Sequence, residues 1–182
     1  MVSRLEAIAA LTGVGQEYEI VPCESWGRSC RMFKQTPENL RQLFESSRSE
    51  ETFIVYGDER YTFDETQRRV ARIANMLVSQ YGICKGDRVA ISMRNYPEWI
   101  MAFNAATSIG AIAVAMNSLW QSEEMEFALK DCGAKVLFAD EERIQRFLPV
   151  KANLDVEVIA VRVNEVPAGE FRKFDDLLKN EM

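Results

Sequence analysis

The chain has 182 residues, enough for a domain with a hydrophobic core, and its 47% apolar and 27% charged residues are ordinary for a globular protein. Its 22 basic and 28 acidic residues give a formal charge of −6, which argues against nucleic acid or an anionic membrane surface as the main partner. No apolar stretch reaches the roughly 18 residues of a membrane span, and the N-terminus is a poor signal peptide, so we expect no transmembrane segment and a cytoplasmic location.

The sequence contains no histidine, which is the commonest general base and zinc ligand. A Ser-His-Asp or Cys-His nucleophile therefore cannot be built from this chain, and we predict neither a catalytic residue nor a metal site within it. The four cysteines, Cys23, Cys30, Cys84 and Cys132, form no Cys-x-x-Cys pair, so we expect four free thiols.

The first 35 residues show the least regular pattern. A short amphipathic helix is expected at the start, and residues 1–35 as a whole are predicted to form an irregular N-terminal arm. Thr36 and Pro37 then predict the start of a helix, with Thr36 as N-cap and Pro37 at the first helical position, where its missing N–H costs nothing. We therefore place the first domain boundary at residue 36.

Residues 52–63 alternate apolar and polar side chains on both sides of Gly57, which predicts a β-hairpin. Thr62 and Glu65 have the spacing of a capping box, which predicts that a helix begins directly after the hairpin. Apolar residues then recur at helical spacing, and Gly82 is predicted to end this helix.

Four apolar runs begin near residues 89, 112, 135 and 156, with helical segments between them. This spacing predicts parallel βαβ units, and the largely unbroken apolar character predicts strands covered on both faces. We therefore predict an α/β fold: a largely parallel sheet with helices on both faces, plus an N-terminal helix and β-hairpin. It would span residues 36–163, followed over residues 164–182 by a loop and a short C-terminal helix.

Residues 96–109 predict a helix that is apolar on nearly all sides and therefore buried on all sides. The sheet can cover one face of this helix, and the sequence offers little to cover the other. A helix over residues 122–132 has, in contrast, a polar outer face. Because large exposed apolar surfaces tend to find partners, we predict that the chain self-associates.

The junction between the run at residue 89 and the following helix has two interpretations. Asn95 as N-cap with Glu98 at the third helical position would form a variant capping box, and this structural interpretation is favoured. Alternatively, Arg94 would hold an anion at the helix N-terminus, but no glycine-rich turn is present to let a phosphate approach. Arg143 and Trp120 each follow a strand, and each is expected to be structural more often than ligand-binding.

Several motifs in order resemble the N-terminal part of the adenylate-forming acyl-CoA synthetases, the AMP-dependent synthetases and ligases. The similarity runs from about residue 36 to 147. The motifs are YTFDE, the GICKGDRVAI turn and strand, MRNYPEWI, GAIAVAMN, and the helix and strand EEMEFALKDCGAKVLFAD. Within this family the chain most resembles the acyl-CoA or fatty-acid-CoA ligases. Where many relatives have proline, this chain has Ala115, which affects a local bend and no chemistry.

This resemblance implies an N-terminal subdomain of an enzyme that uses ATP, Mg²⁺ and CoA. A carboxylic acid, here expected to be a fatty acid, attacks ATP to give an acyl-adenylate and pyrophosphate, and the CoA thiol then displaces AMP. The resemblance maps a contact with the CoA nucleotide onto Trp120 and Arg143. We expect no firm binding of these cofactors to the chain alone.

The family's Ser/Thr/Gly-rich phosphate loop with Pro-Lys-Gly does not occur in the sequence, nor does its C-terminal lysine domain. We therefore expect the 182-residue chain, as a truncated part of the ligase, to be inactive by itself. The alternative is a non-catalytic interaction module derived from that subdomain. A small Rossmann-like nucleotide binder is a weaker alternative, because it needs a glycine-rich turn after a strand.

Overall fold

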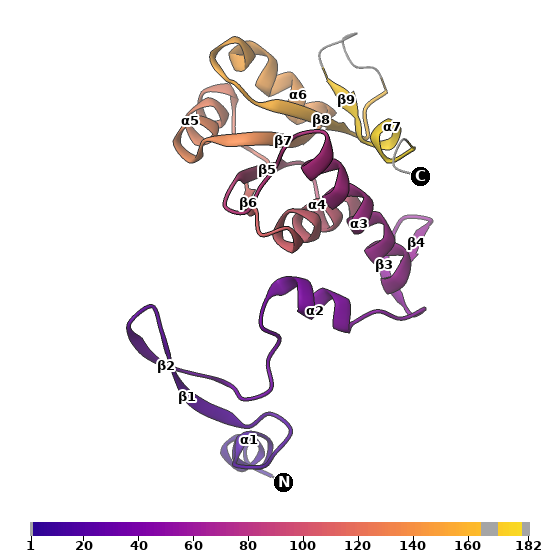
Figure 1. Cartoon of the computed structure of the whole chain (residues 1–182). Helices are drawn as coiled ribbons and strands as arrows, with labels where there is room; N and C mark the ends of the chain where they lie inside the picture. Colours follow the sequence, from indigo (N-terminus) through magenta and orange to yellow (C-terminus); the bar gives the residue numbers. More distant parts are fainter. Residues whose placement is uncertain (1, 165–170, 180–182) are drawn as a thin grey trace. The chain divides into compact units, whose positions relative to one another are not determined.

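The computed structural model describes residues 2–164 and 171–179, and the chain divides into two compact units, residues 1–39 and 40–182 (Figure 1). Each unit is described by itself. Parts of the predicted C-terminal loop, residues 165–170, and the final residues 180–182 lie outside the described residues.

The first unit holds helix α1 (Arg4–Thr12) and a hairpin of β1 (Ile20–Ser25) and β2 (Arg28–Phe33). Helix α1 confirms the short helix expected at the start. Regular strands lie where the sequence predicted an irregular arm. The sequence did not predict this hairpin. None of residues 2–39 is buried, so neither strand shows the alternation of apolar and polar residues that is typical of a half-buried sheet.

The predicted hairpin and capping box of the second unit are confirmed. Strands β3 (Thr52–Tyr56) and β4 (Glu59–Thr62) pair antiparallel, and α3 (Phe63–Ser79) follows directly. The Glu65 N–H donates to Thr62 Oγ1 at 3.0 Å, and the Thr62 N–H donates to the Glu65 carboxylate at 2.9 Å. Gly82, just beyond the helix, has a φ of 60°, which glycine adopts without strain.

The capping box supports a first prediction. Thr62→Ala should lower the free energy of unfolding by about 1 kcal/mol, because it leaves the Glu65 N–H without its acceptor. Thr62→Ser keeps a hydroxyl at this position and is the matched control. Urea unfolding followed by circular dichroism measures both variants, and equal stability of the two would contradict the proposed role of the threonine hydroxyl.

A five-stranded parallel sheet forms the centre of the second unit, in the order β6-β5-β7-β8-β9. Its strands are β5 (Arg88–Ser92), β6 (Ile112–Ala115), β7 (Ala134–Asp140), β8 (Glu157–Val161) and β9 (Arg172–Lys173). The four predicted runs are confirmed as parallel strands, and β9 is an additional short edge strand.

Helices cover both faces of the sheet, which confirms the predicted fold class (Figure 1). On one face lie α3, α4 (Pro97–Ser108) and α7 (Phe174–Lys179), and this core includes Ile73, Met101 and Phe138. On the other face lie α5 (Ser122–Cys132), α6 (Glu141–Phe147) and the 3₁₀ helix η1 (Leu148–Asn153), around Met125 and Leu137.

The expectation that all four strands are covered on both faces is wrong for β6. This strand lies at the sheet edge, and Ile112 keeps 52% of its surface exposed. Because β6 is hydrogen-bonded on one side only among the described residues, its apolar run is not evidence of a central strand. Strands β5 and β8 are buried from their second residue onward, and β7 is buried except at Lys135.

Helix α4 obtains its cover from the chain itself, contrary to the expectation. Helix α3 packs along it, and α2 (Leu40–Ser46) also contacts it. None of its residues is exposed, and Trp99 stacks on Phe103 with ring centroids 5.5 Å apart. The helix predicted to start at Thr36 begins only at Leu40, where the second unit starts, because a capping signal without packing does not fix a helix start.

Candidate functional site

The carboxyl ends of the parallel strands are the place where open α/β sheets bind ligands, at the point where neighbouring strands connect to opposite faces. Here that point lies between β5 and β7. The loop after β5 leads to α4 on one face, and β7 leads directly to α6 on the other. The groups at the junction between these two strand ends therefore form the first candidate site.

A buried carboxylate of the chain itself occupies this junction. Asp140, only 3% exposed, accepts the Arg94 backbone N–H at 2.9 Å through Oδ2 and the Arg143 backbone N–H at 3.1 Å through Oδ1. The second contact caps α6. The Arg94 side chain turns to Glu142 at 3.4 Å. This arrangement holds the two strand ends together and is structural.

The predicted capping box at Asn95 and Glu98 is wrong. Tyr96 is the N-cap of α4, it makes no side-chain cap hydrogen bond, and Pro97 stands at the first helical position. Glu98 instead pairs with Arg162, 64 residues away. The carboxylate that accepts backbone N–H groups at this junction belongs to Asp140, which binds the Arg94 N–H and caps α6 rather than α4.

Arg143, one of the two predicted contacts of the CoA nucleotide, lies almost fully inside the protein. Its side chain is 1% exposed. Its Nε and Nη2 donate to the Ser118 carbonyl at 2.8 and 2.5 Å, and its Nη1 donates to Glu142 at 2.8 Å and to Asp140 at 3.3 Å. All three guanidinium nitrogens are thus engaged, and they join the loop after β6 to the start of α6.

Trp120, the other predicted contact, belongs to the same loop. Its carbonyl accepts a hydrogen bond from Arg146 at 3.2 Å, so the structure brings Trp120 and the arginines of α6 to one edge of the sheet. The half-buried indole lines a mostly apolar pocket of about 540 Å³ between β6 and α5. Phe127, which is 72% exposed, lines the same pocket.

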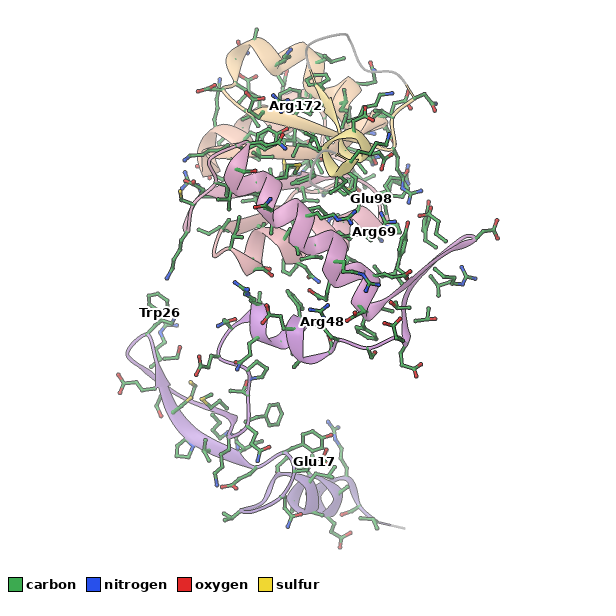
Figure 2. All side chains as sticks on the ribbon, turned by 45° about the vertical axis from the view of Figure 1, so that its right-hand side comes forward. Glu17, Trp26, Arg48, Arg69, Glu98 and Arg172 are labelled. Carbon is green, nitrogen blue, oxygen red and sulfur yellow. The ribbon has the colours of Figure 1, made fainter. Side chains whose placement is uncertain are left out.

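A second cluster, which sequence reasoning missed, surrounds Arg162 at the end of β8. Its Nε donates to both Glu98 oxygens at 3.0 and 2.9 Å, and its Nη2 donates to Glu59 at 2.9 Å. Its guanidinium lies 5.0 and 5.1 Å from the rings of Tyr56 and Tyr96. This Arg162 cluster ties the β3–β4 hairpin to α4 and to the sheet; Figure 2 labels Glu98 beside α3.

The Arg162 cluster predicts a loss of stability in acid. The hydrogen bond from Arg162, followed by that from Tyr61, holds the pKa of Glu59 below its ordinary value. A carboxyl whose pKa is depressed in the folded state stabilises the protein at neutral pH. This contribution is lost as the pH falls from the pKa of the unfolded chain, about 4.3, through the lower pKa of the folded state. The Glu59→Gln variant should therefore show a shallower fall of unfolding free energy below about pH 5.

Urea unfolding of the wild type and of Glu59→Gln between neutral and acid pH measures this difference. Glu50→Gln is the matched control, because Glu50 is an exposed carboxylate near the same hairpin. Identical slopes for the wild type and Glu59→Gln would show that Glu59 does not contribute to the acid sensitivity.

Basic side chains gather in a third place, a groove of about 710 Å³ between α3 and α7. Arg68 pairs with Asp64 at 3.3 Å, and the Arg69 guanidinium lies 4.8 Å from the ring of Tyr61. Figure 2 labels Arg69 at this side of the second unit. These arginines lie on the exposed side of α3, and several of them already have partners. Over residues 2–164 and 171–179, no three His, Cys, Asp or Glu side chains lie close enough to hold a metal ion.

The family described as AMP-binding enzyme matches residues 42–181, which is most of the chain and nearly all of the second unit. The chain belongs to the AMP-binding enzyme family. This membership confirms the resemblance to the adenylate-forming acyl-CoA synthetases.

Individual members of the AMP-binding enzyme family support the same assignment. The chain is 35% identical over 125 residues to a feruloyl-CoA synthase from Amycolatopsis sp, covering 69% of this chain and 24% of that protein. It is 32% identical over 106 residues to the mitochondrial medium-chain acyl-CoA ligase of Homo sapiens, covering 58% and 17%. The crystal structure of an anthranilate CoA ligase with anthranoyl-AMP superposes with a TM-score of 0.73 at 25% identity, over 78% of this chain and 28% of that one.

The chain therefore spans about a quarter or less of the length of these members of the AMP-binding enzyme family. Their names include aromatic as well as aliphatic acids, so the comparisons do not confirm the predicted fatty-acid class. Among the described residues, no helix has both the length and the apolar character needed to cross a membrane.

Proposed function

We propose that the whole protein is an ATP-dependent acid–thiol ligase, to which this chain contributes a scaffold. A carboxylate would attack the α-phosphate of ATP, giving an acyl-adenylate and pyrophosphate. The CoA thiol would then attack the acyl carbon, forming a thioester and releasing AMP. The match to the AMP-binding enzyme family over residues 42–181 carries this proposal.

The chain by itself is proposed to lack this activity. The charged side chains at the carboxyl edge of the sheet, Asp140, Arg143, Glu98 and Arg162, are hydrogen-bonded to one another or to backbone groups. They hold strand ends together and leave little polar surface for a triphosphate. Phosphoryl and adenylyl transfer depend on groups placed around the developing charge, and the described residues show no such arrangement.

Mg²⁺ is proposed as the partner of ATP in the whole enzyme, but no ligand for it is assigned within this chain. The described residues contain no set of three acidic side chains that fits a metal ion. The alternative of a non-catalytic interaction module gains no support, because the family and the relatives all point to ligases. Self-association and a cytoplasmic location stay proposals without a structural argument.

The substrate is proposed to be a carboxylic acid whose tail is either aliphatic or aromatic. The family resemblance favoured a fatty acid, and the 35% identity to a feruloyl-CoA synthase favours an aromatic one.

The CoA nucleotide is proposed to contact Trp120, with Arg143 beside it. The position of the Trp120 indole supports this, since it lines an apolar pocket large enough for a base. Arg143 supports the site from beneath, because its nitrogens hold the Ser118 carbonyl of the same loop. In the whole enzyme, Trp120→Ala should raise KM for CoA and leave KM for ATP unchanged, while Trp120→Phe should retain most of the affinity.

ATP–pyrophosphate exchange with a panel of fatty and aromatic acids tests the proposed function. The 182-residue chain and the longest protein expressed from the same gene are assayed side by side, with acid-free reactions as controls. We expect exchange only in the longer protein, with one class of acid. Exchange by the 182-residue chain would overturn the proposed inactivity, and no exchange by either protein with any acid would overturn the ligase assignment.

A further inference from the structure

Two cysteines face each other across the hairpin of the first unit. Cys23 of β1 and Cys30 of β2 are direct partners in the antiparallel register, and their Sγ atoms lie 3.0 Å apart as free thiols that share a hydrogen bond. Opposite residues of an antiparallel pair have Cα atoms about 4.5 or 5.5 Å apart, and both separations fall within the range that a disulfide accepts. Closing the bond requires a movement of about 1 Å by the two side chains.

The hairpin geometry fixes this pairing. Strands β1 and β2 are joined by Trp26 and Gly27, whose φ angles of 53° and 71° are those of a tight two-residue turn. Figure 2 shows Trp26 at the tip of the hairpin. Cys23 and Cys30 are the third pair from the turn, after Ser25–Arg28 and Glu24–Ser29. Because side chains alternate between the two faces of a strand, directly opposed residues lie on the same face, and both thiols therefore share one face of the hairpin.

We propose that Cys23 and Cys30 form a redox-active dithiol, which exchanges with low-molecular-weight disulfides to form a cross-strand disulfide. In the first step the Cys30 thiolate attacks a small disulfide RSSR, forming a mixed disulfide and releasing one RS⁻. In the second step the Cys23 thiolate attacks the Cys30 sulfur and releases the second RS⁻. The two protein thiols are oxidised, the small disulfide is reduced to two RSH, and the two thiol protons pass to the released thiolates.

The surroundings of the four cysteines single out this pair. Cys30 is exposed, so its thiolate can reach and attack an external disulfide. Cys23 is partly buried beside it and is placed to attack the resulting mixed disulfide. The hydrogen bond between the two sulfurs raises the pKa of Cys23, as expected when the Cys23 S–H donates to Cys30, and this is consistent with Cys30 reacting first. The thiols of Cys84 and Cys132 lie against the backbone carbonyls of Gly82 and Leu129 instead.

Oxidation would change the first unit more than it would change a well-packed domain. None of residues 2–39 is buried, so the hairpin depends on its strand pairing and a few surface contacts such as Tyr18 against Phe33 and Lys34 with Glu19. A covalent link between the strands would restrict the open states of this unit, as a disulfide does for any unfolded chain.

Equilibration of the full chain with reduced and oxidised glutathione at varied ratios tests the proposal. Cys84 and Cys132 are replaced with serine in all samples, so that only the hairpin thiols react. Acid quenching and peptide mass spectrometry then quantify the Cys23–Cys30 disulfide against the mixed disulfides with glutathione. We expect the intramolecular disulfide to dominate, and Cys23→Ser to leave Cys30 as the mixed disulfide.

A register variant provides the matched control. Ser29→Cys combined with Cys30→Ser keeps two thiols and almost the same loop length, but moves the second thiol to the opposite face of β2. We expect the equilibrium constant for the intramolecular disulfide to fall by about tenfold or more, which corresponds to about 30 mV in reduction potential. Equal constants for the two proteins would overturn the proposal, because closeness along the chain would then explain the disulfide. Absence of any intramolecular disulfide in the parent would overturn it as well.

Discussion

Arg143→Leu should lower the free energy of unfolding of the second unit by about 3–5 kcal/mol, the range measured when one partner of a buried ion pair is removed. The expected size follows from burial. The Arg143 side chain is 1% exposed, and Asp140 beside it is 5% exposed. Leucine would fill part of the volume, but it would leave the Asp140 carboxylate buried with fewer donors.

The Ser118 carbonyl would lose two donors at the same time. It accepts hydrogen bonds from Arg143 Nε and Nη2, and a third from Arg146 at 3.0 Å. The loop after β6 would then be held only by Arg146, so we also expect faster hydrogen exchange of the backbone around Ser118. Each lost hydrogen bond from a charged donor costs about 1.5–3 kcal/mol, so the weakened hold on this carbonyl is a substantial part of the total.

Arg146→Leu is the matched control for this variant. It removes an arginine from the same helix that donates to the same carbonyl, but its side chain is 19% exposed and pairs with Glu142, whose side chain is 45% exposed. We expect this control to cost about 1 kcal/mol, as partly exposed pairs do. Urea unfolding compares the two variants, and equal losses would contradict the buried clamp assigned to Arg143.

The sheet could be predicted from the sequence because its signals are local. Each of the four apolar runs has its strand character in four to seven neighbouring residues, as in β7 (Ala134–Asp140), and the helices between them force the parallel arrangement. The capping box of Thr62 and Glu65 is local in the same sense, because its two residues are three positions apart along the chain. Both predictions were confirmed.

The arrangement of the candidate site could not be predicted, because its contacts join residues far apart in the sequence. Arg94 reaches Asp140 over 46 residues, and Arg162 reaches Glu98 and Glu59 over 64 and 103. No pattern in a short window contains such pairs. At Asn95 the local capping signal was present and misleading, because α4 begins at Pro97 with Tyr96 as its N-cap and Glu98 pairs with the distant Arg162.

The Arg162 cluster leads to the second large effect. Arg162→Met should destabilise the second unit by about 2–3 kcal/mol, less than for a fully buried pair because the Arg162 side chain is 28% exposed. Methionine keeps much of the apolar stem and can still pack between Tyr56 and Tyr96. It removes the charge that pairs with Glu98, whose side chain is only 12% exposed, so most of the loss should come from this unpaired carboxylate.

A double-mutant cycle with Glu98→Gln isolates that contribution. When Glu98 is already uncharged, Arg162→Met no longer leaves a buried charge behind, and its cost should fall by at least about 1 kcal/mol. Urea unfolding of the four proteins gives the interaction energy directly. Additive losses would show that Arg162 stabilises the protein through its packing between the two tyrosines and not through the ion pair.

The backbone conformation of Arg162 supports a second, independent prediction about its contribution to stability. Arg162 has a φ of 52°, a left-handed conformation that costs a non-glycine residue about 1–2 kcal/mol. Arg162→Gly removes the same charge and the same aromatic contacts but relieves this strain, so it should be less destabilising than a comparison of side chains alone implies. If Arg162→Gly is nearly as stable as Arg162→Met despite losing the whole side chain, the strain is real and the ion pairs of Arg162 offset it in the native protein. If Arg162→Gly is less stable than Arg162→Met by as much as the loss of a buried methionine side chain costs, the left-handed conformation carries no measurable cost.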